Sequence, residues 1–333
     1  MNRLKALLSL ALLALPLEAA TANDTMANFA AGGLTFSRTD AVGMVSEDLF
    51  LSMDEVRVNY RFRNRTDRDV SGTVAFPMPD IEDHYFSDAD YPDGPPENPM
   101  RFSVTVNGKS IPFSLEKKAM VGEENVTAAL RELKVPLEPY APEVDEALRR
   151  LAPPALKRLE DAGAVEVLDN AGGSGPDTEL IPRWVLRATY HWQQTFPAGQ
   201  DVLIGHRYKP SVGGAVVDLD SLARSGEGIA SYAEGACADR DFVRGARRWA
   251  ERQRKAPVAP LARYIDYVLV TGGNWAGPIG SFKLTVDKKH PDNLVSFCGE
   301  GVKKVGPTQF EMTKTDFVPR QNIKVLILDA GKS

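Results

Sequence analysis

Hydrophobic and polar residues alternate along several stretches of this chain, which predicts β-strands. In residues 55–63 every second side chain is apolar (Val56, Val58, Tyr60 and Phe62), and the residues between them are charged or polar. A polar turn leads into a second expected strand at residues 70–76. Pro77 and Pro79 end that strand, because proline cannot donate a backbone hydrogen bond.

A β-hairpin is expected at residues 102–113, around the dipeptide Asn107-Gly108. This pair tolerates the positive φ angles of a two-residue type I′ turn. Pairing across the turn places Val104 opposite Ile111 and gives both strands an apolar face. Pro112 cannot donate within a sheet, so its strand is expected at an edge.

The spacing of apolar residues changes to a helical period after residue 122. Pro142 suits a first helical turn, and Val144, Leu148 and Leu151 follow at helical spacing. Residues 123–169 are therefore expected to be a small helical insertion, and the glycine-rich stretch 170–178 to be a loop.

Alternation returns at residues 183–196 and 202–208, followed by one helix at 239–255 that Asp239 caps. Further short strands are expected between turn signals, at residues 264–271, 281–287, 294–298, 308–313 and 321–328. Such a pattern indicates a mainly β fold of antiparallel sheets. We expect two Ig-like β-sandwich regions, at 23–122 and 179–333, separated by the helical insertion and loop at 123–178.

The first 22 residues resemble a signal peptide. Arg3 and Lys5 precede a short apolar run, and Ala20-Thr21-Ala22 is a small-residue cleavage pattern. Cleavage after Ala22 would leave 311 residues of the 333. The expected location is the periplasm or the exterior, and no stretch is long enough to predict a transmembrane anchor.

Charge excludes some partners. Without Arg3, Lys5 and Glu18, the 40 basic and 45 acidic residues become 38 and 44, a net charge of about −6. This mild acidity argues against nucleic acid binding.

Cys237 and Cys298 are the two cysteines of the chain. An even count in an oxidising compartment predicts a disulfide bond between them. The alternative is that one of them is a catalytic nucleophile.

An acidic segment at residues 80–94 contains six carboxylates and His84. This density of oxygen ligands suits Ca²⁺, and Asp88, Asp90 and Asp93 are the candidate ligands. Their spacing is not that of an EF-hand loop, and a solvated acidic loop without a cofactor is the alternative.

Two histidines lie on neighbouring expected strands. His206 shares its face with apolar residues, whereas His191 lies on the opposite face from Trp192. Because the two rings then point to different sides of a sheet, a zinc site is disfavoured and a hydrogen-bonded core His206 is expected.

The helix at 239–255 carries seven cations. Such a face suits an anionic envelope component or another envelope protein, with Arg244, Arg247, Arg248 and Arg252 as candidate contacts. A solvated charged face is the alternative.

A series of short motifs follows in a fixed order along the sequence: Asn23-Asp24, Gly32-Gly33-Leu34, Glu47-Asp48-Leu49, the Tyr60 to Phe76-Pro77 segment, Phe196-Pro197-Ala198-Gly199, His206, Tyr208, Cys237, Asn274-Trp275 and Cys298. In these motifs and their order the chain resembles a family of exported bacterial proteins catalogued as domain of unknown function 4424. The resemblance implies an envelope location and no particular activity. Residues 50–115 also resemble the β-rich module of inter-alpha-trypsin inhibitor heavy chains, which suggests an interaction role by analogy.

These observations favour an exported, non-enzymatic binding or scaffold module. One alternative is a metal-dependent hydrolase of an envelope polymer, centred on Asp83, His84 and Asp88. Another is a structural partner of an envelope protein that docks through the helix at 239–255.

Overall fold

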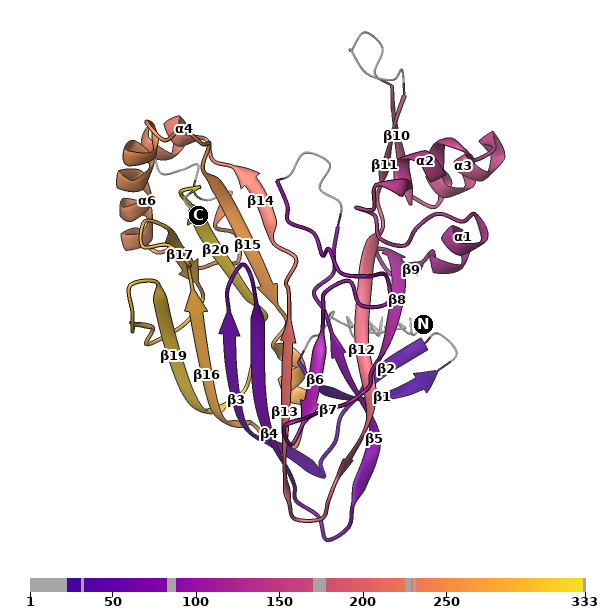
Figure 1. The fold of residues 1–333 in the computed structure, drawn as a ribbon, viewed down its shortest axis with the longest axis vertical. Coiled ribbons are helices and arrows are strands. Elements are labelled where there is room, and N and C mark those ends of the chain that lie inside the picture. Colours follow the sequence, from indigo (N-terminus) through magenta and orange to yellow (C-terminus); the bar gives the residue numbers. More distant parts are fainter. Residues whose placement is uncertain are drawn as a thin grey trace, which may run out of the picture.

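A computed structural model describes residues 23–30, 33–82, 88–169, 178–224, 229 and 232–331. Within these ranges the fold is mainly β, as expected, with several antiparallel sheets and a few helices (Figure 1). Residues 1–22, which contain the expected signal peptide, lie outside the described residues, as do Asp83 and His84.

The largest sheet has eight strands and combines strands from both halves of the chain. In spatial order its strands are β18 (Lys303–Lys304), β19 (Gln309–Phe317), β16 (Ile279–Asp287), β3 (Val42–Leu51), β4 (Val56–Asn64), β13 (Asp201–Tyr208), β6 (Ser103–Val106) and β7 (Lys109–Ser110). Strands β16 and β3 pair in parallel, and the other neighbours are antiparallel.

A second sheet has six strands. In spatial order they are β2 (Gly33–Ser37), β1 (Thr25–Ala30), β5 (Val70–Pro77), β12 (Val185–Phe196), β8 (Ser114–Val121) and β9 (Glu124–Asn125). Strand β12, from the second half of the chain, lies between β5 and β8 from the first half.

The remaining strands form two smaller sheets. A four-stranded sheet has the order β14 (Gly213–Val216), β15 (Leu261–Tyr267), β20 (Ile323–Asp329) and β17 (Leu294–Phe297), and a two-stranded ribbon joins β10 (Val165–Asp169) to β11 (Thr178–Pro182). Helices α4 (Leu219–Arg224) and α6 (Arg240–Gln253) cover the four-stranded sheet, and the side chain of Asp239 caps α6 as expected, accepting from the Phe242 backbone at 2.7 Å.

The main core lies where the eight-stranded sheet packs against the other two sheets. The alternating apolar residues of β4 point into this core and its charged residues point outward. Phe76 of the six-stranded sheet contacts Tyr208 of the eight-stranded sheet, with ring centroids 5.8 Å apart. Tyr267 of the four-stranded sheet meets Tyr60 through a hydroxyl contact of 2.9 Å. One continuous core therefore joins all three sheets.

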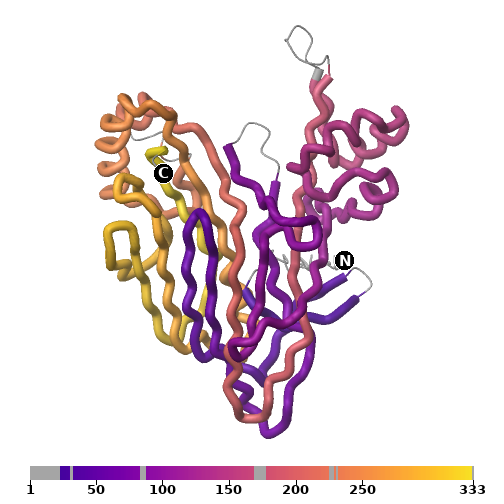
Figure 2. The backbone as a smooth tube through the Cα atoms, in the orientation of Figure 1, coloured from indigo at the N-terminus to yellow at the C-terminus, as the bar shows by residue number. Residues whose placement is uncertain are grey.

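Two neighbouring connections carry the chain between the two large sheets. The β4–β5 and β12–β13 connections lie side by side at the narrow end of the molecule (Figure 2). Asn64 Nδ2 donates to the Phe196 carbonyl at 2.8 Å, and the Ala198 backbone donates to Asp69 at 2.8 Å. His191 and His206 consequently lie in different sheets, although we expected their strands to be neighbours in one sheet.

Most expected elements are present. The hairpin at 102–113 is confirmed: Asn107 and Gly108 have φ angles of 50° and 79°, and β7 forms an edge of its sheet. The expected helical insertion contains α1 (Thr127–Glu132), α2 (Glu143–Arg149) and α3 (Pro153–Asp161), but residues 165–169 at its end form strand β10. Residues 170–177 of the expected loop lie outside the described residues. The arrangement as two Ig-like sandwiches is not confirmed, because each large sheet contains strands from both regions.

Candidate functional site

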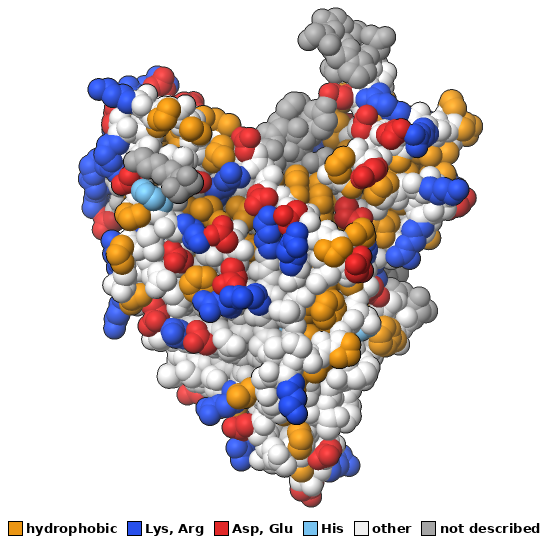
Figure 3. Space-filling model, in the orientation of Figure 1, with side chains coloured by type: hydrophobic (Ala, Val, Ile, Leu, Met, Phe, Trp, Pro, Cys, Tyr) orange, Lys and Arg blue, Asp and Glu red, His pale blue; other side chains and the backbone are white. Residues whose placement is uncertain are grey.

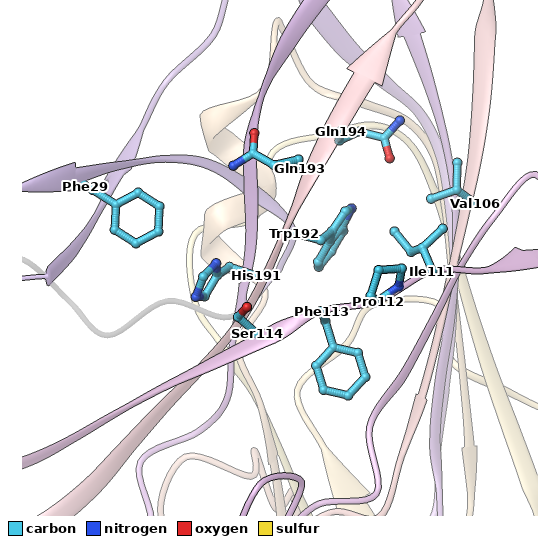
Figure 4. Close-up of a pocket in the computed structure, with 10 residues that line it drawn as sticks. All are labelled: Phe29, Val106, Ile111, Pro112, Phe113, Ser114, His191, Trp192, Gln193 and Gln194. Atoms are coloured by element: carbon cyan, nitrogen blue, oxygen red, sulfur yellow. The ribbon is translucent and has the colours of Figure 1, made fainter.

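A cavity of about 470 Å³ opens beside the segment where the chain leaves the eight-stranded sheet and enters the six-stranded sheet (Figure 4). Residues from four strands and from the segment between β7 and β8 line it: Phe29, Val106, Ile111, Pro112, Phe113, Ser114, His191, Trp192, Gln193 and Gln194. Its volume lies in the range of small-molecule sites.

The edge of β12 borders this cavity. Strand β8 pairs with β12 over residues 185–191, and β5 pairs with the other edge over residues 189–196. No described strand continues the β8 side beyond His191. The open edge allows a ligand to approach Trp192 and its neighbours.

Trp192 lies at the centre of the cavity in Figure 4, and its indole is almost completely buried, with 4% of the residue exposed. The indole nitrogen has no hydrogen-bond partner among the described residues. A buried N–H group without an acceptor is unfavourable, so this donor suits an acceptor oxygen supplied by a ligand or a water. The ring also lies 5.2 Å from the ring of His206, at the core side.

Aromatic and uncharged polar groups surround Trp192. Phe29 is 63% exposed, and its ring meets that of His191 edge-on at 5.4 Å. Partial burial lowers the pKa of His191, and the nearby Glu116 opposes that shift, so the imidazole is neutral at pH 7. No Lys, Arg, Asp or Glu is among the described lining residues. The cavity is therefore suited to an uncharged ligand.

A second group of polar residues is buried where the three sheets meet. His206 and Asp24 are joined at 2.9 Å between Nε2 and Oδ1, and Asn23 donates from its amide to Glu47 at 3.0 Å. Tyr267 donates to Glu47 at 3.3 Å and accepts from Tyr60 at 2.9 Å. We call these six residues the buried polar cluster: Asn23, Asp24, Glu47, Tyr60, His206 and Tyr267.

Burial perturbs the acids of this cluster. Desolvation raises the pKa of Glu47 to about 8; the Asn23 and Tyr267 hydrogen bonds oppose the shift, and the charge of Asp24 adds to it. Desolvation also raises the pKa of Asp24, against the attraction of His206. The pKa values of Tyr60 and Tyr267 lie well above their ordinary value for the same reason. The core His206 has the hydrogen bond that the sequence led us to expect.

Cys237 and Cys298 form the expected disulfide bond, with their Cα atoms 4.9 Å apart. The bond joins the segment that precedes α6 to the end of β17. The cysteines are therefore structural, and a free nucleophilic thiol is not present at these positions.

The three candidate calcium ligands, Asp88, Asp90 and Asp93, are not brought together as a group, although two of them share a lysine. Asp90 and Asp93 each lie 3.5 Å from the ammonium group of Lys209, and Asp93 also pairs with Arg101 at 3.2 Å. Asp88 is exposed. Among the described residues, no three His, Cys, Asp or Glu side chains are grouped as a metal site. The calcium site at Asp88, Asp90 and Asp93 stays a prediction.

The cations of α6 have two different environments. Arg247 donates to the carbonyls of Ala223 and Arg224 at 3.1 and 3.3 Å, and so fastens α6 to the end of α4. Arg244 pairs with Asp241. Arg248 and Arg252 are exposed, and basic side chains gather along the edge that α4 and α6 form (Figure 3). Contact of this edge with an anionic partner stays a prediction.

Sequence reasoning missed both the cavity and the buried polar cluster. Trp192 belongs to the alternating stretch at 183–196, and Glu47 belongs to the motif Glu47-Asp48-Leu49. The residues that surround them in the structure come from distant segments of the chain. A charged residue at an inward position of a strand would have been a signal for Glu47, had the strand at residues 42–51 been recognised.

No helix of the described chain has the length and apolar character needed to cross a membrane. A comparison with curated proteins finds no match. A solved structure from Legionella pneumophila subsp. pneumophila str. Philadelphia 1, described as a "putative nutrient binding protein", is 15% identical with a TM-score of 0.43, and the alignment covers 92% of this chain and 70% of that chain.

The looser likeness of residues 50–115 to inter-alpha-trypsin inhibitor heavy chains is not supported by these comparisons. The profile of one family matches residues 22–326, nearly the whole chain. The segments that carried the resemblance in the sequence supply most of the buried polar cluster, including Asn23, Asp24, Glu47 and His206. The chain belongs to the family described as Domain of unknown function (DUF4424).

Proposed function

We propose that this protein is an extracytoplasmic, non-enzymatic binding module that holds a neutral saccharide unit in the cavity at Trp192. The observation that carries the proposal is the combination of exposed aromatic surface with an unpartnered buried indole N–H in an uncharged cavity. The predicted signal peptide and the disulfide bond support the location outside the cytoplasm.

Each part of the cavity suits a different part of such a ligand. The ring of Phe29 offers an apolar face on which the C–H side of a sugar ring can rest. The indole N–H of Trp192 is buried without an acceptor, so a ring or hydroxyl oxygen that reaches it after a shift of the lining side chains would satisfy it. The carboxamides of Gln193 and Gln194 both donate and accept, as sugar hydroxyls do. Each amide nitrogen already donates within the protein, Gln193 to Thr73 at 2.8 Å and Gln194 to the Thr195 carbonyl at 2.6 Å, so the carboxamide oxygens are the groups offered to a ligand.

The lining of the cavity supports ligand binding rather than catalysis. Its described lining has no carboxylate pair for acid and base catalysis, and His191 is its single titratable side chain. Glycoside hydrolysis ordinarily requires two carboxyl groups at the scissile bond.

The test is a fluorescence titration of the mature protein with a panel of neutral oligosaccharides and with their uronic acid counterparts. We expect saturable binding of at least one neutral member and weaker binding of its charged counterpart. Trp192→Phe should abolish the fluorescence change, and calorimetric titration of the same variant should show an affinity about tenfold lower, since one hydrogen bond to the ligand is removed.

Trp249→Phe is the matched control, because its indole donates to the Asp292 carbonyl at 2.8 Å on the far side of the four-stranded sheet. Equal loss of binding in both tryptophan variants, or no binding by any neutral member of the panel, would contradict the proposal.

A further inference from the structure

The first described residues of the chain are held inside the molecule. Asn23, Asp24 and Thr25 are completely buried. The Thr271 hydroxyl donates to the Asn23 carbonyl at 2.8 Å, and the Trp275 indole donates to the Asp24 carbonyl at 2.5 Å. Chain ends are ordinarily mobile and exposed, so this degree of burial requires a physical reason.

The buried segment begins at the residue that cleavage after Ala22 would make the first of the mature chain. The Asn23 backbone nitrogen already donates to Thr271 Oγ1. The side chain of the same residue donates to Glu47 Oε2 at 3.0 Å. The nitrogen that would become the α-amino group therefore belongs to a residue whose side chain contacts a buried carboxylate.

The two acids of the buried polar cluster have different kinds of partner. Asp24 has His206 as its partner. The hydrogen-bond donors to Glu47 are neutral, namely the Asn23 amide and the Tyr267 hydroxyl, and Tyr60 lies behind that hydroxyl. No Lys or Arg of the described chain forms an ion pair with Glu47 or Asp24. A buried carboxylate without a counter-ion is unfavourable.

Acceptor atoms without donors are gathered at the same place. Within the described residues, Oδ1 of Asn23 and Oδ2 of Asp24 are buried and have no hydrogen-bond partner. Buried acceptors in native proteins are normally satisfied. The cluster thus contains an acid, Glu47, with no Lys or Arg partner and two buried oxygens without donors, and a single ammonium group supplies both a positive charge and N–H donors.

We propose that cleavage after Ala22 completes the buried polar cluster, because the new α-ammonium group of Asn23 becomes the counter-ion of Glu47. Hydrolysis adds one water across the Ala22–Asn23 peptide bond and breaks its C–N bond. The Ala22 carbonyl carbon becomes a carboxylate, and Asn23 nitrogen receives both protons of that water and becomes an ammonium group. The α-ammonium group of Asn23 is then a buried cation that pairs with Glu47. Cleavage after Ala22 therefore stabilises the folded state.

The test compares two chains that differ by one residue: the protein beginning at Asn23 and a matched protein that retains Ala22. Both carry one α-amino group, but in the longer chain it is displaced by one residue from Glu47. We expect the chain beginning at Asn23 to melt on the order of 5 °C higher. Its α-amine should resist an amine-acylating reagent while folded, and the α-amine of the longer chain should react.

Glu47→Gln distinguishes an ion pair from a general effect of chain length. It should remove most of the melting difference between the two chains, whereas Asp48→Asn, at the exposed neighbour of Glu47, should leave the difference intact. Equal melting temperatures of the two chains, equal amine reactivity, or mass spectrometry of exported protein showing a first residue other than Asn23 would overturn the proposal. These outcomes do not depend on the cavity at Trp192.

Discussion

His206 Nε2 lies 2.9 Å from Asp24 Oδ1, although 182 residues separate the two side chains in sequence. Both side chains are completely buried, so the contact joins the residue before β1 to the interior of the eight-stranded sheet. The first residues of the described chain are thereby part of the core.

Substitutions of Asp24 and of Tyr208 should affect the free energy of unfolding very differently, because of these two side chains only that of Asp24 has a hydrogen-bond partner among the described residues. Asp24→Ala removes the side chain that pairs with His206 Nε2, and we expect the free energy of unfolding to fall by about 1–3 kcal/mol. Tyr208→Phe should be neutral or stabilising by about 1 kcal/mol, because the buried Tyr208 hydroxyl has no hydrogen-bond partner in the described structure. Urea denaturation measures both. A destabilised Tyr208→Phe variant would show that this hydroxyl has a partner, such as a buried water.

The raised pKa of Glu47 predicts how stability depends on pH when Asn23 remains in a peptide bond. The folded pKa is about 8 and the ordinary value is 4.5, so the folded state holds the proton more tightly than the unfolded state. The contribution of Glu47 is fully present below pH 4.5 and is lost as the pH rises toward 8. We expect urea midpoints of a chain that retains Ala22 to fall across this window.

Glu47→Gln should flatten that dependence, because the amide does not titrate. Asp48→Asn, at the adjacent exposed carboxylate, is the control and should keep it. Identical pH profiles in the parent and the Glu47→Gln chain would assign the dependence to another group.

The disulfide bond should contribute strongly to stability. It closes a separation of 61 residues, which corresponds to about 4 kcal/mol in the chain-entropy estimate. We expect the double variant Cys237→Ala, Cys298→Ala to lose that amount in reversible denaturation. Reductant should lower the midpoint of the parent protein and leave the double variant unchanged, and a reductant effect on the double variant would contradict the assignment.

Arg247 and Arg248 should differ in spite of being neighbours. Arg247→Ala removes the two hydrogen bonds to the end of α4, and we expect a loss of about 1–2 kcal/mol and faster proteolysis near α4. Arg248→Ala should change stability by less than about 0.5 kcal/mol, because the side chain is exposed.

Charge reversal at Arg248 and Arg252 tests the predicted docking surface without disturbing α4. We expect this variant to recover less of an anionic envelope partner from an extract than the parent protein does. Equal recovery would indicate that the basic edge is only a solvated surface.

Local patterns predicted individual elements well. The alternation at residues 55–63 and the Asn107-Gly108 turn each correspond to observed structure, because side-chain periodicity and turn geometry depend on adjacent residues. Residues 264–271 were expected as one strand, but β15 ends at Tyr267 and a 3₁₀ turn begins at Val270. That turn carries Thr271 to the buried Asn23.

Sheet composition and the candidate sites depended on contacts that no local pattern contains. The strand at residues 42–51 includes the consecutive polar residues Ser46, Glu47 and Asp48. Because they interrupt the alternation of apolar and polar positions, neither the strand nor the inward-facing carboxylate of Glu47 was predicted. Its parallel neighbour is β16, far along the sequence. The cavity likewise joins Phe29 to residues near 111 and 192, which only the fold brings together.

The parallel pairing of β3 with β16 also bears on how the protein acquires its fold during synthesis. Strand β3 ends at Leu51, but its partner strand begins only at Ile279. An emerging chain must therefore keep an unpaired, partly apolar edge for most of its translation, and folding dominated by such distant pairings is slow. We expect the nascent protein to require protection from aggregation by chaperones until β16 has been synthesised.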